Sequence, residues 1–303
     1  FIFRNYNSPI YSVSEQFSGS LINMKLKENE IFYTPHYNLP FIVHKNSFVT
    51  VHDFIQFKFP EYFSRAKVKI AWHVLKNTVK KAKKIIIVSN STLEDFCHFF
   101  PDFKFKTRVI YNGVSSIFKV LENSQKSDFM EKNKLGKYIL FIGNNKPHKN
   151  IIKLINSFNL LKKEFDNLQL VIISKDFKID TLSFEINKFK DKIEKDRFRI
   201  DKTVIKSIRI IDEINDYELV YYYNCALMLV MPSYYEGFGL PVIEAMACGC
   251  PVVTSNLSSL NEIGKGAAIL INPYDVMSIT DGIRKLIKDD VLRNDCIRNG
   301  FKR

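Results

Sequence analysis

The chain lacks several features that would assign it to a protein class at once. It has no run of about 18 consecutive apolar residues, so we expect no membrane-spanning helix. No secretory signal is visible, and no Ser-His-Asp, zinc-ligand or P-loop arrangement occurs. These absences argue against membrane-spanning proteins, serine hydrolases, zinc enzymes and P-loop nucleotidases.

Cysteine is scarce and odd in number. The five cysteines are Cys97, Cys225, Cys248, Cys250 and Cys296. Only Cys248 and Cys250 lie close together in sequence, and no second pair of ligands accompanies them, so we expect no metal site. Most of the five lie among apolar residues, and we expect reduced thiols in a cytosolic protein.

Acidic residues are fewer than basic ones: the chain has 45 Lys and Arg and 32 Asp and Glu, which gives a net charge of +13. The excess is concentrated between Lys58 and Lys84, where Glu61 is the only acid. Such a block attracts nucleic acid, anionic lipid or phosphorylated substrates, although a solvated helix face explains it equally well. No nucleic-acid motif accompanies it, so we expect no specific nucleic-acid partner.

Three aromatic residues lie within this basic block: Tyr62, Phe63 and Trp72. Their spacing suggests an amphipathic helix with one apolar face. That face would lie either on a membrane surface or against the protein core. The sequence leaves both alternatives open.

Apolar runs rich in Val, Ile and Leu alternate with helical patterns along the chain. Strands are expected at 31–33, 48–51, 85–88, 108–111, 138–142, 168–173, 207–211, 227–231, 252–254 and 268–271. Helices are expected near 62–82, 92–99, 151–164, 217–224, 240–247 and 276–288, whereas 179–206 fits no pattern. This alternation predicts the α/β class with parallel sheets covered on both faces.

A length of 303 residues suits two domains of ~100–200 residues each. The stretch 123–137 is polar and without pattern, so we expect it to be the linker. It would separate an N-terminal Rossmann-like domain at 1–122 from a C-terminal one at 138–303. Ligands of such domains bind at the carboxyl ends of the strands.

The most informative stretch reads YEGFGLPVIEAMACG and begins at Tyr235. Its proline suits the first position of a helix, and Gly237 and Gly239 present backbone N–H groups just before it, where phosphate binds. Glu236 falls in the loop and Glu244 in the first helical turn, and ionised carboxylates accept hydrogen bonds from sugar hydroxyls. The stretch therefore predicts a ligand with phosphate and polyol groups, such as a nucleotide sugar.

A second turn, GNNKPHKN at residues 143–150, follows an expected strand and precedes a helix. Lys146 and Lys149 carry point charges on flexible stems that reach phosphate oxygens. The alternative is an ordinary turn with exposed lysines. The sequence thus offers a diphosphate clamp that follows the first strand of the second half.

In the first half, His52 ends an expected strand and is followed by Asp53. A neutral imidazole at a strand end can bond a sugar hydroxyl or a departing phosphate oxygen. Asp53 either orients His52 or caps the next turn. Further along, Ser89 suits a helix N-cap, and Asn112-Gly113 favours a turn with positive φ.

These motifs resemble those of the retaining glycosyltransferases of family 4, which have the GT-B fold. The stretch from Glu236, completed by Gly249 and Pro251, resembles their donor-site signature. Residues 143–150 resemble their Gly-x-x-x-Pro-Arg-Lys-Asn turn, with His148 in place of arginine and Asn144 where many relatives carry a further arginine. The His52-Asp53 pair also resembles theirs.

The resemblance implies transfer of a hexose, such as mannose, from a nucleoside diphosphate sugar to a glycan or lipid-linked acceptor in cell-surface polysaccharide biosynthesis. No metal or other cofactor is expected. Glu236 would hold the sugar near the reacting carbon, Lys149 the leaving diphosphate, and His52 the sugar from the other side of a cleft. The donor-binding residues would be Gly143, Ile210 and Ile211 (against the base), Gly237, Phe238, Gly239, Leu240 and Glu244 (on the ribose).

The family's first strand and its glycine-rich loop normally precede the part that matches here, so we expect an incomplete N-terminal domain. The missing arginines and the short chain leave an alternative: a non-catalytic nucleotide-sugar-binding or membrane-associated scaffold protein. In either case we expect a cytoplasmic protein that can associate with the inner face of the cell membrane.

Overall fold

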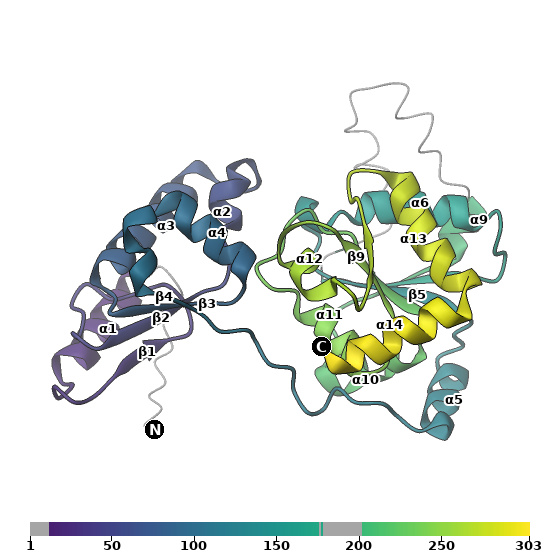
Figure 1. The fold of residues 1–303 in the computed structure, drawn as a ribbon, viewed down its shortest axis with the longest axis horizontal. Coiled ribbons are helices and arrows are strands. Elements are labelled where there is room, and N and C mark those ends of the chain that lie inside the picture. Colours follow the sequence, from purple (N-terminus) through teal and green to yellow (C-terminus); the bar gives the residue numbers. More distant parts are fainter. Residues whose placement is uncertain (1–11, 176, 178–201) are drawn as a thin grey trace. The chain divides into compact units, whose positions relative to one another are not determined.

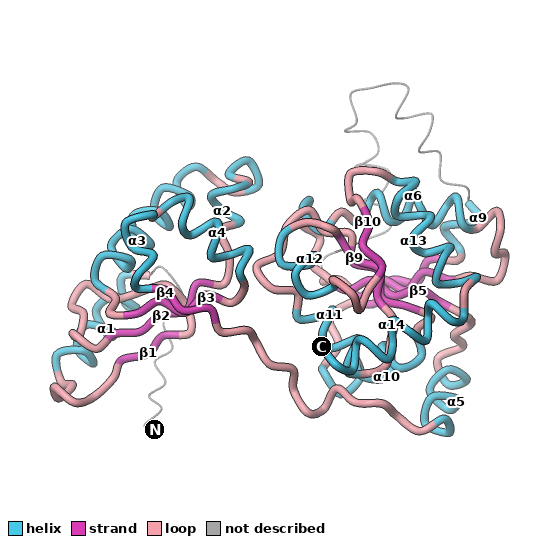
Figure 2. Tube along the Cα trace, in the orientation of Figure 1, coloured by secondary structure: helices cyan, strands magenta, loops and turns pink. Residues whose placement is uncertain are grey.

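A computed structural model describes residues 12–175, 177 and 202–303. The chain divides into two compact units, Phe1–Asn112 and Gly113–Arg303, and each has a parallel sheet and helices (Figures 1 and 2). The α/β class predicted from the sequence is confirmed. Most of the unassigned stretch 179–206 lies outside the described residues.

The N-terminal unit contains a four-stranded parallel sheet in the order β1-β2-β3-β4. Its strands are β1 (Phe32–Thr34), β2 (Ser47–Val51), β3 (Lys84–Ile87) and β4 (Thr107–Val109). Its helices are α1 (Val13–Met24), α2 (Ile55–Lys58), η1 (Pro60–Tyr62), α3 (Arg65–Lys81), α4 (Asn90–Phe99) and η2 (Pro101–Lys106). Ser89 caps α4 by accepting the N–H of Thr92 at 3.0 Å, as its sequence position predicts.

The aromatic residue at the centre of the basic block belongs to this unit's core. Trp72 on α3 stacks on Phe100 at 5.2 Å between ring centroids and meets Phe57 edge-on at 5.3 Å. Such aromatic pairs add to the stability that burial already provides. Of the two alternatives for the apolar face of α3, core packing therefore accounts for Trp72. The exposed side of the helix keeps its lysines.

The segment between the two units differs from the expectation in two ways. Asn112 and Gly113, between which the two units divide, have no positive φ and belong to no helix or strand. Residues 123–132 of the expected linker form helix α5 (Asn123–Lys132). Phe129 of this helix stacks on Tyr221 at 5.1 Å, so an apolar contact that the polar composition concealed holds α5 within the second unit.

The C-terminal unit contains a six-stranded parallel sheet in the order β10-β9-β8-β5-β6-β7. The strands are β5 (Tyr138–Ile142), β6 (Gln169–Ile173), β7 (Ile208–Ile211), β8 (Met228–Met231), β9 (Val252–Ser255) and β10 (Ile269–Ile271). The central strands are buried on both faces, which explains their continuous apolar sequences.

Helices lie on both faces of this sheet. They are η3 (Pro147–Lys149), α6 (Ile151–Leu161), α9 (Lys202–Lys206), α10 (Asp216–Cys225), α11 (Leu240–Ala247), α12 (Ser258–Gly264), α13 (Val276–Lys288) and α14 (Asp290–Lys302). Figure 1 shows α6 and α13 over one face and α10, α11 and α14 over the other. The strand order thus reverses at β5: β6 and β7 lie on one side of it in the sheet, and β8, β9 and β10 lie on the other.

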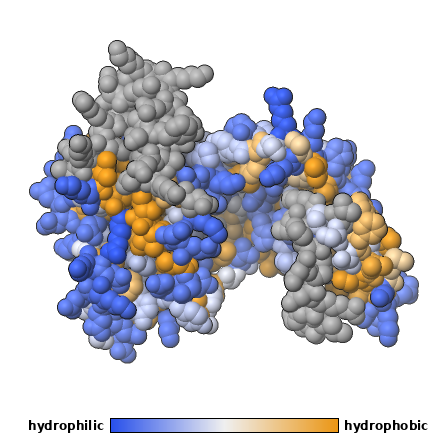
Figure 3. Space-filling view, turned by 180° about the vertical axis from the view of Figure 1, so that it is seen from behind, coloured by the Kyte–Doolittle hydropathy of each residue, from blue (hydrophilic) through white to orange (hydrophobic). Residues whose placement is uncertain are grey.

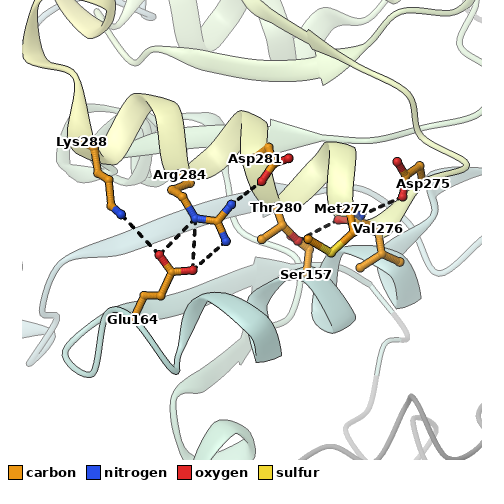
Figure 4. Close-up of polar contacts among 9 residues, drawn as sticks. All are labelled: Ser157, Glu164, Asp275, Val276, Met277, Thr280, Asp281, Arg284 and Lys288. Atoms are coloured by element: carbon orange, nitrogen blue, oxygen red, sulfur yellow. Dashed lines mark hydrogen bonds and ion pairs between the residues drawn. The ribbon is translucent and has the colours of Figure 1, made fainter.

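Helices α6 and α13 are joined by polar contacts along their length (Figure 4). Arg284 donates to the carboxylate of Glu164 at 2.6 Å, and buried Thr280 lies 3.0 Å from the hydroxyl of Ser157. Asp275 caps α13 by accepting the N–H of Met277 at 2.9 Å. These contacts fix the start of α13, and with it the loop that follows β10.

Hydrophilic residues cover much of the surface of each unit, with smaller apolar areas among them (Figure 3). The largest exposed apolar side chains include Phe17, Leu21 and Met24, which share one face of α1. Among the helices that the structure describes, none is long and apolar enough to cross a bilayer.

Candidate active site

The candidate site lies in the C-terminal unit, at the carboxyl ends of β5 and β8. These neighbouring parallel strands are the point at which the strand order reverses, and ligands of doubly wound sheets bind at such a point. The loop after β5 carries Gly143 and Lys149, and the loop after β8 carries Glu236 and leads into α11. The fold therefore brings the two predicted motifs to one place.

Lys149 and Glu236 form an ion pair between these loops. Nζ of Lys149 lies 2.6 Å from Oε1 of Glu236, and the two side chains are only 14% and 13% exposed. A charge-assisted hydrogen bond of this length is among the stronger polar contacts in proteins. Each side chain thereby provides the countercharge that the other, poorly solvated one needs. The residues assigned to the leaving diphosphate and the sugar are thus adjacent.

Asn150 anchors the lysine turn, a role that the sequence did not reveal. Its backbone is left-handed, with φ of 60°, and its side chain is buried. Nδ2 donates to the carbonyl of Pro232 after β8 at 3.0 Å and to that of Pro273 after β10 at 2.7 Å. One side chain thereby ties together three loops at the carboxyl edge of the sheet.

His148, which stands where relatives carry arginine, does not add a positive charge at neutral pH. Its side chain is buried. Burial first, and then the charges of Lys149 and Lys146, lower the pKa of His148 from 6.5 to about 4. Its backbone carbonyl accepts the N–H of Tyr234 at 2.8 Å, which adds a second link between the loops. The positive charge of this turn comes from its two lysines.

Two serines of α12 hold the backbone of Glu236. The N–H of Glu236 donates to Oγ of Ser258 at 3.1 Å, and Oγ of Ser259 donates to the Glu236 carbonyl at 2.8 Å. Ser258 adopts a φ of 49°, which is uncommon for a residue other than glycine. Strain of this kind persists where the surrounding contacts determine the backbone, often at functional sites.

Gly239 must be glycine at the start of α11. Its φ is 109°, and an added Cβ would lie 2.8 Å from Cδ2 of Leu260. Helix α11 begins at Leu240, and Pro241 occupies its second position. Glu244 therefore falls at the start of the second turn of the helix, one position later than the sequence pattern suggested, because the helix begins one residue before the proline.

Glu244 is partly buried and bound by a tyrosine of α10. Oη of Tyr223 donates to Oε2 of Glu244 at 2.8 Å. Burial raises the pKa of Glu244, the hydrogen bond from Tyr223 lowers it, and Asp216 raises it further. Nothing in the motif itself pointed to Tyr223, which lies on the preceding helix.

The remaining predicted donor residues of this unit have different environments. Gly143 lies against the stem of Lys149, where an added Cβ would be 3.5 Å from Cδ. Phe238 is buried, whereas Leu240 is exposed. Ile210 and Ile211 are half-buried at the carboxyl end of β7, the edge strand of the sheet. Their contact with a nucleobase stays a prediction, as does the direct role of Gly237 in phosphate binding.

His52 belongs to the N-terminal unit and is exposed at the carboxyl end of β2. Its Nε2 lies 2.7 Å from the carbonyl of Pro35 and so donates to it. Asp53 accepts the N–H of Ile55 at 3.0 Å, as a residue that caps the next turn does. Contact between His52 and the donor sugar stays a prediction.

Among the described residues, no group of three or more His, Cys, Asp or Glu side chains is placed to hold a metal ion. The five cysteines are free thiols. Burial raises the pKa of Cys248 to about 12, so this thiol stays protonated at neutral pH. Independence from metal ions stays a prediction that ligand binding must test.

Known proteins with similar sequences are glycosyltransferases. Residues 122–303 match the family model of Glycosyl transferases group 1, and residues 32–116 match that of Glycosyltransferase Family 4. The chain is 30% identical over 275 residues to O-antigen chain mannosyltransferase B of Escherichia coli, covering 89% of this chain and 68% of that protein. It is 29% identical over 264 residues to O-antigen chain mannosyltransferase RfbU of Salmonella typhimurium, covering 87% and 66%. The chain thus spans about two thirds of the length of these relatives.

Solved structures share the fold. Anabaena Alr3699/HepE, solved in complex with UDP and glucose, matches with a TM-score of 0.66 at 18% identity, over 84% of this chain and 66% of that one. A likeness at this identity concerns the fold alone, which is GT-B. The matched family models cover both units, and the glycine-rich motif with its two glutamates lies within the longer match. The chain therefore belongs to the group 1 family of glycosyl transferases.

Proposed function

We propose that this protein is a retaining hexosyltransferase. It would transfer mannose or a similar hexose from a nucleoside diphosphate sugar to a glycan or lipid-linked acceptor in cell-surface polysaccharide biosynthesis. The observation that carries the proposal is the ion pair of Lys149 and Glu236 beside the start of α11. The names of the two O-antigen mannosyltransferase relatives support mannose and the pathway.

The two ends of the ion pair suit the two ends of the bond that breaks. Lys149 would contact the diphosphate, on which negative charge grows as the bond to the anomeric carbon breaks. The N-terminus of α11 would add its dipole. Glu236 would accept hydrogen bonds from sugar hydroxyls beside that carbon. The acceptor hydroxyl oxygen would then bond to the anomeric carbon on the face that the diphosphate leaves, and the hydroxyl proton would pass to the departing diphosphate, so that the configuration is retained.

Glu244 would bind the ribose of the same donor. Its carboxylate lies on α11, in the turn that follows the glycine cap, so phosphate and ribose would be bound by successive parts of one helix. The UDP bound in the Anabaena neighbour supports a nucleoside diphosphate as ligand. Ile210 and Ile211 would border the base, and His52 would contact the sugar.

We also propose that α3 binds an anionic membrane surface, at which a lipid-linked acceptor would be found. Lys69, Lys76 and Lys80 are exposed along this helix, and in the described part of the chain none of them forms a salt bridge. Each lysine near such a surface contributes roughly 1 kcal/mol of attraction. The protein would then work on the inner face of the cell membrane.

Calorimetry with GDP, UDP, TDP and their sugars, with and without Mg²⁺, tests the proposed site directly. We expect saturable binding of one diphosphate, independent of Mg²⁺, and weaker binding in Glu244→Ala. Absence of binding to every nucleotide would refute the proposed donor site. Binding that requires Mg²⁺ would refute the metal-free mechanism.

One observation favours the non-catalytic alternative: His148 is neutral, so this turn has one positive charge fewer than an arginine would provide. A scaffold protein would bind the nucleotide sugar without consuming it. Release of the nucleoside diphosphate in the presence of membrane extract separates the two functions. Turnover that disappears in Glu236→Ala would establish transfer.

A further inference from the structure

Tyr223 contacts the ribose-binding candidate from outside the recognised motif. Tyr223 lies on α10 and is completely buried, and its ring meets that of Phe118 edge-on at 5.9 Å between centroids. Its hydroxyl lies 2.8 Å from Oε2 of Glu244 on α11. A phenylalanine would fill the same space, so packing alone does not explain the hydroxyl.

The direction of this hydrogen bond follows from the chemistry of the two groups. An ionised carboxylate can only accept, so Tyr223 donates. A carboxylate with restricted access to water needs such a donor, because an uncompensated buried charge is costly. Oε2 of Glu244 is thereby occupied. Among the hydrogen bonds of the described residues, Oε1 takes part in none.

We propose that Tyr223 is a positioning residue for the donor nucleotide: its hydroxyl fixes the Glu244 carboxylate in one orientation and leaves Oε1 for a ribose hydroxyl. The inference rests on the proposed function, because it takes Glu244 as the ribose ligand. It adds to that function a residue whose effect reaches the ligand only through another side chain.

The same contact controls the ionisation of Glu244. Burial and Asp216 raise the pKa of Glu244, and the hydrogen bond from Tyr223 opposes them. The titratable groups that act on Glu244 are Tyr223 and Asp216, both from α10. The elements β8, β9, α12 and α14 also pack near α11, and no described group on them shifts this pKa. Removal of the hydroxyl therefore raises the pKa of Glu244.

The first test compares ribose and dideoxyribose nucleotides. In Tyr223→Phe, affinity for the bound nucleoside diphosphate should fall by about tenfold. Affinity for its 2′,3′-dideoxy analogue should hardly change, because that analogue offers Glu244 no hydroxyl. Binding should also require a higher pH than in the wild type. A loss of stability alone would move neither the ratio of the two affinities nor the pH profile.

Tyr138→Phe is the matched control. Tyr138 is also completely buried, and its hydroxyl donates to the α10 backbone at the carbonyl of Tyr222, at 2.8 Å. This variant loses a hydroxyl that binds the same helix but no carboxylate. It should keep the wild-type preference for ribose and the wild-type pH profile.

A second variant changes the same hydrogen bond in the opposite direction. Fluorotyrosine at position 223 keeps the ring and carries a more acidic hydroxyl, which is a stronger donor. Carboxyl NMR should then show the pKa of Glu244 lowered in the fluorotyrosine protein and raised in Tyr223→Phe. This measurement needs no nucleotide and so does not depend on the proposed function.

The outcomes distinguish a failure of the inference about Tyr223 from a failure of the proposed ribose role of Glu244. If Glu244→Ala loses the ribose preference and Tyr223→Phe keeps it, the inference is wrong and the ribose role of Glu244 stands. If Glu244→Ala keeps the preference, both are wrong. A pKa of Glu244 that is the same in all Tyr223 variants would also overturn the inference.

Discussion

Lys149 and Glu236 neutralise each other at 2.6 Å between Nζ and Oε1. Each is the nearest fixed countercharge that the structure gives the other, and both are largely shielded from water. The proposed donor, with its diphosphate and sugar, would supply a new partner to each of them. The ion pair thus holds both charges where the proposed donor would contact them.

Lys149→Ala should slow turnover far more than it weakens nucleotide binding. The lost cation acts mainly on the charge that develops on the departing diphosphate, so we expect a fall in kcat of roughly 10²–10³. Steady-state kinetics measures the change. Lys175→Ala is the control, because Lys175 pairs with Glu213 at 2.9 Å on the exposed surface. Equal rates for Lys149→Ala and the wild type would exclude the clamp.

Gly239→Ala should destabilise the C-terminal unit. The new Cβ would suffer the strain of a φ of 109° and also a 2.8 Å contact with Leu260. Gly266→Ala separates these effects, because Gly266 has a φ of 79° and open space around it. We expect Gly239→Ala to lose about 1–3 kcal/mol more in the free energy of unfolding than Gly266→Ala. Urea denaturation of both variants checks this, and equal losses would show that the contact with Leu260 is unimportant.

Much of the fold could be predicted because local patterns determine it. The continuous apolar residues of β8 predict a buried strand, and the periodic apolar residues of α13 predict a helix. The same reasoning missed α5, whose composition is polar. It also placed a positive-φ turn at Asn112-Gly113, and neither residue has a positive φ. Propensity is a weak guide where a tertiary contact or a connection decides the conformation.

The residues of the candidate site also differ in whether a local pattern predicts them. Glu236 and Lys149 could be found because each lies in a motif with a chemical meaning of its own. Ser258, Tyr223 and Asn150 act through contacts with distant segments, which no local pattern contains. Sequence reasoning therefore finds the groups that would touch the ligand more easily than those that hold them.

Glu244→Gln should separate stability from binding. The folded-state pKa of Glu244 lies above its ordinary value of 4.5, chiefly because of burial. The ionised form is therefore disfavoured in the folded protein. The contribution of this group to stability is complete below the unfolded pKa and is lost as the pH rises through the folded one. At pH 7 the neutral glutamine should raise the free energy of unfolding.

Chemical denaturation at pH 7 and near pH 4 measures this difference, which should shrink toward the lower pH. The same substitution should weaken nucleotide binding by about 1–3 kcal/mol, since it removes a charge-assisted hydrogen bond. Calorimetry at pH 7 provides that value. Unchanged affinity would refute the ribose role, and a stability gain that persists at low pH would refute the ionisation argument.

Replacement of Lys69, Lys76 and Lys80 by glutamate should abolish binding to anionic vesicles. The three side chains are exposed on α3, so the change leaves the core intact. Reversal of their charge turns roughly 1 kcal/mol of attraction per residue into repulsion. Sedimentation with vesicles of phosphatidylglycerol and phosphatidylcholine measures the bound fraction. The wild type should bind less as salt rises, because the surface attraction is screened.

A control protein with Lys265, Lys285 and Lys302 changed to glutamate carries the same net charge, with the changes in the C-terminal unit. If both triple variants lose binding equally, net charge and not α3 determines the association.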